Sequence, residues 1–334
     1  MRALICRDWG DIDTLELADI PAPEPGPGQV LLDIVASSAN FADSIMVAGN
    51  YQTKPAFPFA PGLEAAGRIR AVGAGVENLK PGDAVMAKLA HGGFAEQAVA
   101  EAGETWPLFE GMDFAVGAAF AVAYLSAHVA IRWQGRLEAG ETLLVLGAAG
   151  GSGLAAVEIG KAMGARVIGA ASSAEKLAAV REHGADEAVN YVDQELKDQV
   201  LELTNGQGAD VCFDPVGGPL FDSALSSLGW GGRFIHFGFV AGVPKVPANR
   251  LLVKHRSAMG SSLRYFQNRR PDLLARSMAE LADYFAAGTL RPIISHRLAL
   301  EQGVEALRLL TERRAIGKVV VDVSPEQAPK QESN

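Results

Sequence analysis

The sequence predicts an α/β protein in which a doubly wound parallel sheet is combined with a second, mostly β region. Three observations support this fold class. The first 120 residues are rich in β-type segments and turns. From Thr142 onward, strand-like and helix-like segments alternate, which is typical of a parallel sheet. At the start of that alternation, an apolar run leads into a glycine-rich turn and then into a helix.

The N-terminal region is predicted to form strands separated by turns. Strands are expected at 30–35, 63–69 and 84–87. Gly26-Pro27-Gly28 precedes the first of these strands and Pro81-Gly82 precedes the third. Because Gly and Pro favour turns, these dipeptides mark where the strands begin.

The glycine-rich turn predicts a pyrophosphate site. Residues 144–153 read Leu-Val-Leu-Gly-Ala-Ala-Gly-Gly-Ser-Gly, with small residues spaced as in a dinucleotide-binding fingerprint. Such residues let the backbone approach the phosphates, and the helix that follows offers unpaired N–H groups. The turn supplies five candidate cofactor-binding residues, Ala148, Gly150, Gly151, Ser152 and Gly153. Taken alone, this loop could also be a plain turn. The strands and helices that alternate after it favour the phosphate site.

The alternation itself predicts a Rossmann sheet. The expected strands are 142–146, 166–170, 187–191, 210–214, 233–237 and 257–260. The expected helices include 153–163 and 173–183, ended by Gly164 and Gly184, then 271–287 and 301–313. A last strand is expected at 317–323, and the polar tail from Ser324 is expected to be disordered.

The end of the second strand indicates which dinucleotide binds. An NAD site usually has an acidic residue about 20 residues after the glycines, to hold the ribose 2′-OH. Here Ser172, Ser173 and Lys176 follow the strand, and no acid stands at its end. Two hydroxyls and an ammonium group would bind a 2′-phosphate, so the sequence predicts NADPH over NADH. Ser172 could also cap the next helix, with Glu175 as its capping-box partner.

Composition argues against several classes of partner. The net charge of −9 and the pI near 5.3 disfavour nucleic acid or an anionic membrane. No signal peptide is expected, and no apolar run reaches the ~18 residues of a membrane span; the longest candidate is 118–131. Cys6 and Cys212 form no disulfide framework, so a cytoplasmic location is expected.

Taken together, several segments resemble the medium-chain dehydrogenase/reductase superfamily, in its zinc-free quinone oxidoreductase (zeta-crystallin-like) branch. These segments are Asn40-Phe41-Ala42-Asp43, Gly49-Asn50-Tyr51-Gln52 with Pro58 to Glu64, Leu137 to Glu141, and Arg314 to Lys318. The resemblance implies a GroES-like catalytic domain (1–121 and 263–334) interrupted by a Rossmann NADPH-binding domain (122–262). It also implies an active site between the two domains and a homodimer formed mainly through the nucleotide domains.

The sequence offers little support for a metal or for other reaction classes. Zinc-dependent relatives carry a ligand His in Gly-His-Glu, where this chain has Gly62-Leu63-Glu64, and two cysteines cannot build a four-cysteine zinc lobe. Its six histidines include no i,i+4 pair, so they are interpreted as packing or surface residues. No Gly-x-Ser-x-Gly elbow of a hydrolase and no Tyr-x-x-x-Lys pair of a short-chain dehydrogenase is present.

The resemblance also assigns the remaining site residues. It places Asn40, Asp43 and Tyr51 beside the nicotinamide and the acceptor; the alternatives are helix capping for Asn40 and Asp43 and loop packing for Tyr51. It also suggests cofactor contacts from Ser126, Tyr191 and Arg314. Independently of the resemblance, the carboxyl ends of the fourth and fifth parallel strands, where ligands bind in such sheets, add Asp214, Val216, Gly238 and Phe239. Tyr191 would pack on the adenosine end, and Arg314 would lie near the 2′-phosphate. Alternatively, Tyr191 is an aromatic residue that packs at the end of a strand, and Arg314 is an ordinary surface charge.

The expected function is therefore zinc-independent hydride transfer from NADPH to a quinone or a conjugated enone. Reduction of the C=C bond of a 2-alkenal or an enoyl thioester needs the same hydride delivery and remains a close alternative. A non-catalytic NADPH-binding sensor is an alternative of another class. Tyr51 and Asn40 favour an enzyme over the sensor, because both can donate a hydrogen bond to a carbonyl.

Overall fold

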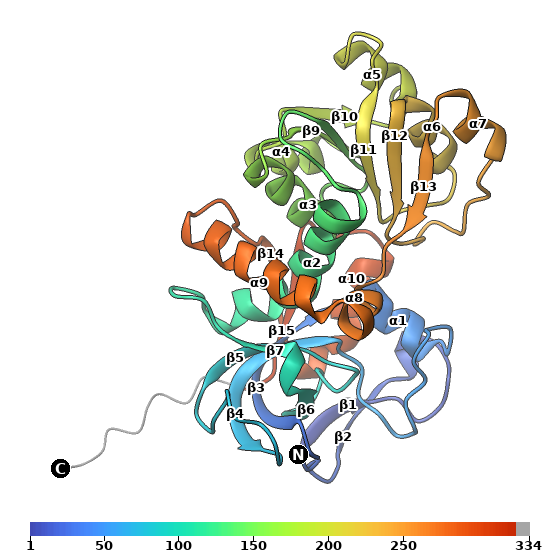
Figure 1. Cartoon of the computed structure of the whole chain (residues 1–334). Coiled ribbons are helices and arrows are strands. Elements are labelled where there is room, and N and C mark those ends of the chain that lie inside the picture. Colours follow the sequence, from blue (N-terminus) through green and yellow to red (C-terminus); the bar gives the residue numbers. More distant parts are fainter. Residues whose placement is uncertain (325–334) are drawn as a thin grey trace. The chain divides into compact units, whose positions relative to one another are not determined.

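The computed structural model describes residues 1–324, which form two compact units (Figure 1). One unit consists of Met1–Val122 together with the C-terminal segment from Ile294, and the other of Ala123–Ile293. We call them the catalytic unit and the nucleotide unit. The α/β fold class predicted from the sequence is confirmed. The polar tail expected to be disordered lies outside the described residues, apart from Ser324.

The catalytic unit is built on a seven-stranded sheet with the order β14-β15-β3-β4-β5-β7, in which β6 pairs with β3. A separate hairpin pairs β1 with β2. The elements are β1 (Arg2–Ile5), β2 (Glu16–Asp19), β3 (Gln29–Ala39), α1 (Phe41–Val47), β4 (Glu64–Val72), β5 (Ala84–Lys88), β6 (Gln97–Glu101), β7 (Thr105–Pro107), β14 (Ile294–Ala299), α10 (Gly303–Thr311) and β15 (Lys318–Asp322). The three N-terminal strands predicted from the sequence are therefore present.

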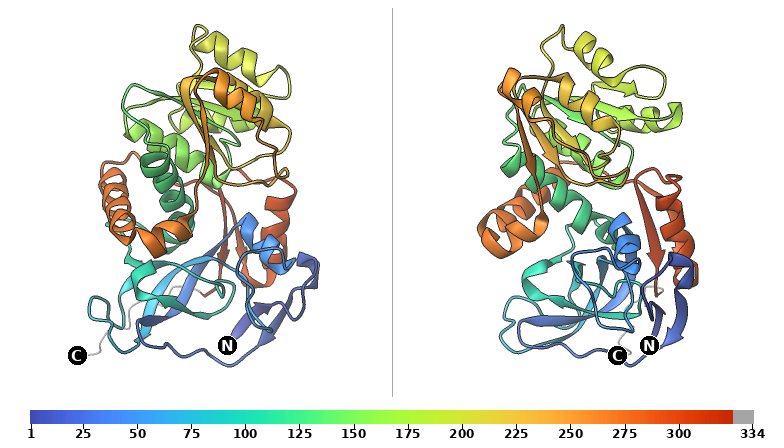
Figure 2. Two further views of the ribbon diagram at one scale, coloured as in Figure 1. Left: turned by 45° about the vertical axis from the view of Figure 1, so that its right-hand side comes forward. Right: turned by 90° about the vertical axis from the view of Figure 1, so that its right-hand side faces the viewer.

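The last strand of the chain joins this N-terminal sheet. β15 pairs antiparallel with β3, with Val319 opposite Ala39, and parallel with β14 on its other side. Figure 2 shows the red C-terminal strands beside the blue N-terminal ones. Val319 and Val321 are buried in the same apolar core as residues of β3 and β4.

The nucleotide unit contains the predicted Rossmann sheet. Its strands follow the order β10-β9-β8-β11-β12-β13, and every neighbouring pair is parallel. Numbered from β8, this order reads 3-2-1-4-5-6, and it reverses direction between β8 and β11. The elements are β8 (Thr142–Val145), α3 (Gly151–Ala162), β9 (Arg166–Ala171), α4 (Ala174–Glu182), β10 (Glu187–Asn190), α5 (Leu196–Leu203), β11 (Ala209–Asp214), α6 (Leu220–Ser227), β12 (Leu228–His236), α7 (Ala248–Val253), β13 (Ser257–Gly260), α8 (Leu263–Arg269) and α9 (Pro271–Ala286).

The second boundary between the units lies later than the sequence suggested. Residues 263–293 were expected in the catalytic domain, yet the structure includes them in the nucleotide unit. The reason is local packing. The indole of Trp133 donates to the Ser277 hydroxyl on α9 at 2.8 Å, and Arg132 pairs with Glu280 at 3.3 Å. Helix α9 thus belongs with the segment that follows α2.

One apolar helix departs from the expectation that no segment has the length of a membrane span. Helix α2 (Phe114–His128) continues through a π-helical segment, Val129–Gln134. This 21-residue helix is long and apolar enough to cross a membrane, and an 18-residue stretch of it has a mean hydropathy of 1.9. Of that stretch, 89% is buried inside the protein, as in the core helix of a globular fold. The search for an uninterrupted apolar run did not identify this helix, because Ser126 and His128 lie within it.

Candidate functional site

The glycine-rich turn has the geometry of a phosphate-binding loop. Gly150 donates its N–H to the Gly147 carbonyl at 3.0 Å, and Gly147 has a φ of 56°. A Cβ at Gly153 would lie 2.2 Å from the Gly147 oxygen, so only glycine fits there. Helix α3 starts at Gly151, and its N-cap, Gly150, offers no side-chain acceptor. The first N–H groups of α3 are therefore available to a bound anion.

The loop that follows β11 at Asp214 meets this turn where the sheet order reverses, and the loop that follows β12 at Gly238 is hydrogen-bonded to it. The Asp214 carboxylate ends β11 and accepts the N–H groups of Val216 and Gly217, both at 2.8 Å. Val216 lies against the turn, because a Cβ at Gly147 would lie 2.8 Å from its side chain. Gly238 donates to the Asp214 carbonyl at 3.1 Å. Burial raises the pKa of Asp214, although the two backbone donors oppose that shift.

The residues expected to select NADPH lie at the end of β9. Ser173 is the N-cap of α4, and its hydroxyl accepts from the Lys176 N–H at 3.4 Å. The capping alternative for Ser172 is therefore wrong by one residue. Ser172 directly precedes the cap, and no acidic side chain interrupts the segment from Ala171 to Ser173.

Three further candidates of the nucleotide unit differ in their surroundings. Tyr191 follows β10, donates its N–H to the Ala171 carbonyl at 3.4 Å and packs partly on the core. It therefore lies at the same edge of the sheet as the end of β9. Phe239 is 57% exposed, whereas Ser126 is buried within α2.

In the catalytic unit, Asn40 belongs to a buried polar cluster. Its amide donates to Glu64 Oε1 at 2.9 Å and accepts from Lys318 Nζ at 2.9 Å. Lys318 Nζ also lies 2.7 Å from Glu64 Oε1. The second Glu64 oxygen accepts the N–H of Val122 in α2 at 2.8 Å. Glu64 is fully buried and therefore needs this combination of a cation and hydrogen bonds.

Asp43 holds two backbone segments together. Its oxygens accept the N–H groups of Asn40 at 2.8 Å and of Gly62 at 3.0 Å, and the residue is fully buried. Burial raises the pKa of Asp43 from 3.8 to about 7, against the opposing effect of these bonds and of Lys318. This geometry favours the capping alternative for Asp43, because both oxygens are already used by the backbone.

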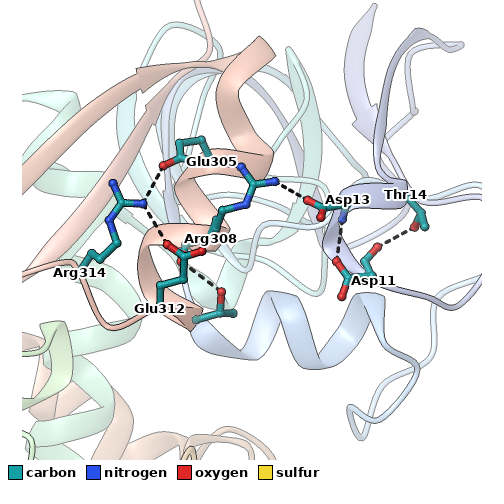
Figure 3. A network of polar contacts seen from close by, with 8 residues as sticks. Asp11, Asp13, Thr14, Glu305, Arg308, Glu312 and Arg314 are labelled. Atoms are coloured by element: carbon teal, nitrogen blue, oxygen red, sulfur yellow. Dashed lines mark hydrogen bonds and ion pairs between the residues drawn. The ribbon is translucent and has the colours of Figure 1, made fainter.

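Tyr51 and Arg314 have contrasting environments. Tyr51 is half-buried and packs against the core of the catalytic unit. The guanidinium of Arg314 pairs with Glu305 at 3.2 Å and with Glu312 at 3.0 Å (Figure 3). Because these two carboxylates already pair with the Arg314 guanidinium, its position is explained without a cofactor phosphate. This favours the alternative that Arg314 is an ordinary surface charge.

The part of the chain that the structure describes contains no group of three or more His, Cys, Asp or Glu side chains placed to hold a metal. Leu63, at the position where zinc-dependent relatives would carry a ligand, is buried in the core of the catalytic unit. Cys6 and Cys212 are buried and unpaired.

Sequence reasoning missed Glu64 and Lys318 as site residues. Both stood in the segments that carry the family resemblance, but they are 254 residues apart in the chain. Only the pairing of β15 with β3 brings Lys318 to Asn40, and no local pattern predicts that pairing.

Comparison with known proteins gives consistent matches to both units. Residues 26–127 match the family described as alcohol dehydrogenase GroES-like domain, and residues 151–280 match the family described as zinc-binding dehydrogenase. A quinone oxidoreductase-like protein 2 homolog from Nematostella vectensis is 37% identical over 325 residues, covering 96% of this chain and 88% of that protein.

Solved structures agree with this similarity. A mycobacterial protein in complex with NADPH has a TM-score of 0.91 and 31% identity, covering 97% of this chain and all of its own. The Escherichia coli quinone oxidoreductase in complex with NADPH has a TM-score of 0.90 and 25% identity, with the same coverage.

Proposed function

Because this chain belongs to the quinone oxidoreductase branch of the medium-chain dehydrogenase/reductase superfamily, we propose that it transfers a hydride from NADPH to a quinone or a conjugated enone. The observation that carries the proposal is the turn 147–153, where a required glycine and an uncapped helix start meet at the reversal point of the sheet. The nicotinamide supplies the hydride, and the protein binds and orients the reactants.

The residues of the nucleotide unit fit this cofactor. The N–H groups at the start of α3 would hold the pyrophosphate, and the loop tied down by Asp214 lies beside them. Ser172, Ser173 and Lys176 would hold the 2′-phosphate, since a lysine and hydroxyls pair with a dianion. Tyr191, at the same edge, would pack on the adenosine.

We propose Tyr51 as the group that donates a hydrogen bond to the acceptor carbonyl. A donor at this place stabilises the negative charge that develops on the oxygen when a conjugated substrate accepts a hydride. The reaction in this proposal needs no zinc. Leu63 provides no ligand, and the carboxylate of Glu64 is already bound by Lys318 and Asn40.

The proposal is tested by turnover. Purified protein should oxidise NADPH with at least one member of a panel of quinones, enones, 2-alkenals and enoyl-CoA esters. Preference for quinones or enones would support the proposed acceptor class, whereas preference for alkenals or thioesters would favour the alternative. Tight NADPH binding without turnover on any member of the panel would indicate the sensor function instead.

We also propose a cytoplasmic homodimer. β13 is the edge strand of the Rossmann sheet, and nearby apolar side chains are strongly exposed: Val243 (77%), Leu252 (82%) and Val253 (69%). A second copy that covers this edge would remove them from water. Light scattering on a sizing column should give twice the mass of 35.1 kDa. The two unpaired cysteines suit a reducing compartment.

A further inference from the structure

The nucleotide unit contains a basic cavity that the proposed reaction does not use. Its volume is about 600 Å³, which is in the range of small-molecule sites. Three arginines and a histidine line it together with one acidic residue: Arg136, Arg233, Arg256, His255 and Glu138. In a chain with a net charge of −9, this concentration of cations in one cavity is unusual.

The cavity lies at the amino ends of the sheet strands, whereas the glycine-rich turn lies at their carboxyl ends. Arg136 and Glu138 precede β8, whereas the turn follows the carboxyl end of that strand. Arg233 on β12 stands opposite Ser257, the first residue of β13. The four residues of β8, at about 3.3 Å each, separate these two ends of the sheet by roughly 13 Å. A ligand in this cavity would therefore occupy a site separate from that proposed for NADPH.

The arginines of the cavity retain unused donors. Arg233 donates to the Arg136 carbonyl at 3.3 Å and pairs with Glu141 at 2.5 Å, but its buried Nε has no partner among the described residues. Arg256 donates through Nε and Nη2 to backbone carbonyls, including that of Ser226 at 3.1 Å. Its Nη1 group has no partner in residues 1–324, and the Arg136 guanidinium forms no ion pair there.

The cavity is electropositive, and two of its residues lie directly after the ends of helices. Burial lowers the pKa of Arg256, and the neighbouring Arg250 lowers it further, so an anion nearby would relieve both effects. Arg136 and His255 adopt φ angles of 49° and 53°. Only two other non-glycine residues in the described part of the chain, Asn205 and Arg313, have a positive φ. Each of these four residues directly follows the C-cap of a helix, where a left-handed residue commonly ends the helix.

We propose that this cavity binds a small polyanion that carries two or more phosphate or carboxylate groups. Guanidinium groups present planar pairs of N–H donors that match the oxygens of either group. Arg136, whose guanidinium forms no ion pair in residues 1–324, and the Nη1 group of Arg256 would bind the anion. The ligand class is shared by phosphorylated and carboxylated metabolites, and the experiment distinguishes the two.

The test is a calorimetric titration of the full-length protein with inorganic pyrophosphate and, separately, with citrate. Ionic strength is held constant with NaCl, and NADPH is present in excess so that the phosphate-binding residues of the cofactor site are occupied. We expect one equivalent of at least one probe to bind with a dissociation constant below about 1 mM. The probe that binds more tightly identifies the phosphate or the carboxylate source.

Variants locate the binding. Arg136→Gln should weaken the anion about tenfold, and because its side chain is exposed, the fold should be retained. Arg256→Lys should also weaken it, since the charge remains but the planar donors are lost. Arg269→Gln is the matched control: it removes an exposed arginine of the same unit outside the cavity and should leave binding unchanged. Absence of binding, equal losses in all three variants, or no loss in Arg136→Gln would each overturn the proposal.

Discussion

Among single residues, Lys176 is the one on which the proposed preference for NADPH over NADH depends. It follows the N-cap Ser173 by three residues, in the first turn of α4. A charge-assisted hydrogen bond to a phosphate contributes roughly 1.5–3 kcal/mol. Lys176→Ala should therefore weaken NADPH binding by about ten- to a hundredfold and leave NADH nearly unchanged. Fluorescence titrations with both cofactors measure this, and equal losses for the two would contradict the assignment.

Tyr51 should matter for the chemical step and not for cofactor binding. Tyr51→Phe should slow hydride transfer by about one to two decades, less than the loss of a dedicated oxyanion-hole donor. The loss should be larger for an enal than for a quinone, because a quinone is already electron-poor. Single-turnover rates with both acceptors test this. Rates equal to those of the wild type would make Tyr51 a packing residue only.

Asp43 should make stability depend on pH. Its folded pKa of about 7 lies above its ordinary value of 3.8, so the folded state binds a proton more tightly than the unfolded state between these values. The free energy of unfolding should therefore fall as the pH rises from about 4 to about 7. Asp43→Asn should flatten this part of the profile, and denaturant titrations at pH 4, 5.5, 7 and 8 measure the difference from wild type. An unchanged slope would show that burial does not perturb this carboxyl.

At the residue scale, local motifs predicted the geometry of the glycine-rich turn and of the start of α4 better than the surroundings of Asn40. The glycines and the serines after β9 form contiguous patterns whose geometry is local. Asn40, Glu64 and Lys318 depend on strand pairings between distant parts of the chain. Their mutual contacts, which occupy the Asn40 amide, are invisible in a linear pattern.

Among the elements, the turn before α3 has the strictest steric requirement. Gly153→Ala would place a methyl group 2.2 Å from the Gly147 carbonyl oxygen, so the backbone of the turn would have to move. Overpacking of this kind costs about 1–3 kcal/mol of unfolding free energy. Gly150→Ala is the control, because its Cβ would be 3.4 Å from the same oxygen; we expect a change within about 0.5 kcal/mol. Similar stability for the two variants in urea titrations would contradict this account.

Most elements were predictable because their periodicity is strong and turn residues bound them. The six Rossmann strands were all predicted, with ends that differ by at most a few residues except at β12. That strand starts at Leu228 rather than 233, because the residues before Arg233 include two adjacent glycines, Gly231 and Gly232. Glycines in a strand-like segment indicate a turn or a bulge, and here the pairing with β11 shifts register between Leu228 and Arg233, with Gly231 at a φ of 69°.

For the whole molecule, the absence of a ligand at Leu63 has an analytical consequence. Purified protein should contain well under one zinc per chain and keep its activity in EDTA. The control is a zinc-dependent relative that carries the Gly-His-Glu motif, treated in parallel. Elemental analysis that finds about one zinc per chain, with activity lost on chelation, would overturn the zinc-free reaction.

The unit boundary at Ile294 shows what composition alone cannot reveal at this scale. Helix α9 has an ordinary amphipathic sequence, and its place is decided by contacts such as Trp133 with Ser277. Those contacts are tertiary, so a resemblance to a family gives the number and kinds of domains more reliably than their limits.

The position of β15 between β14 and β3 also determines the order in which the chain can fold during synthesis. The ribosome releases β3 and Glu64 before the strand that completes their sheet, and the lysine that neutralises that carboxylate is translated 254 residues after Glu64. Residues 123–293 are continuous, so the Rossmann unit can fold while the N-terminal segment still has an open sheet edge. The sheet that contains β3 is therefore completed only after the whole Rossmann unit has been synthesised, and a nascent chain stalled before Lys318 would expose that edge to other chains.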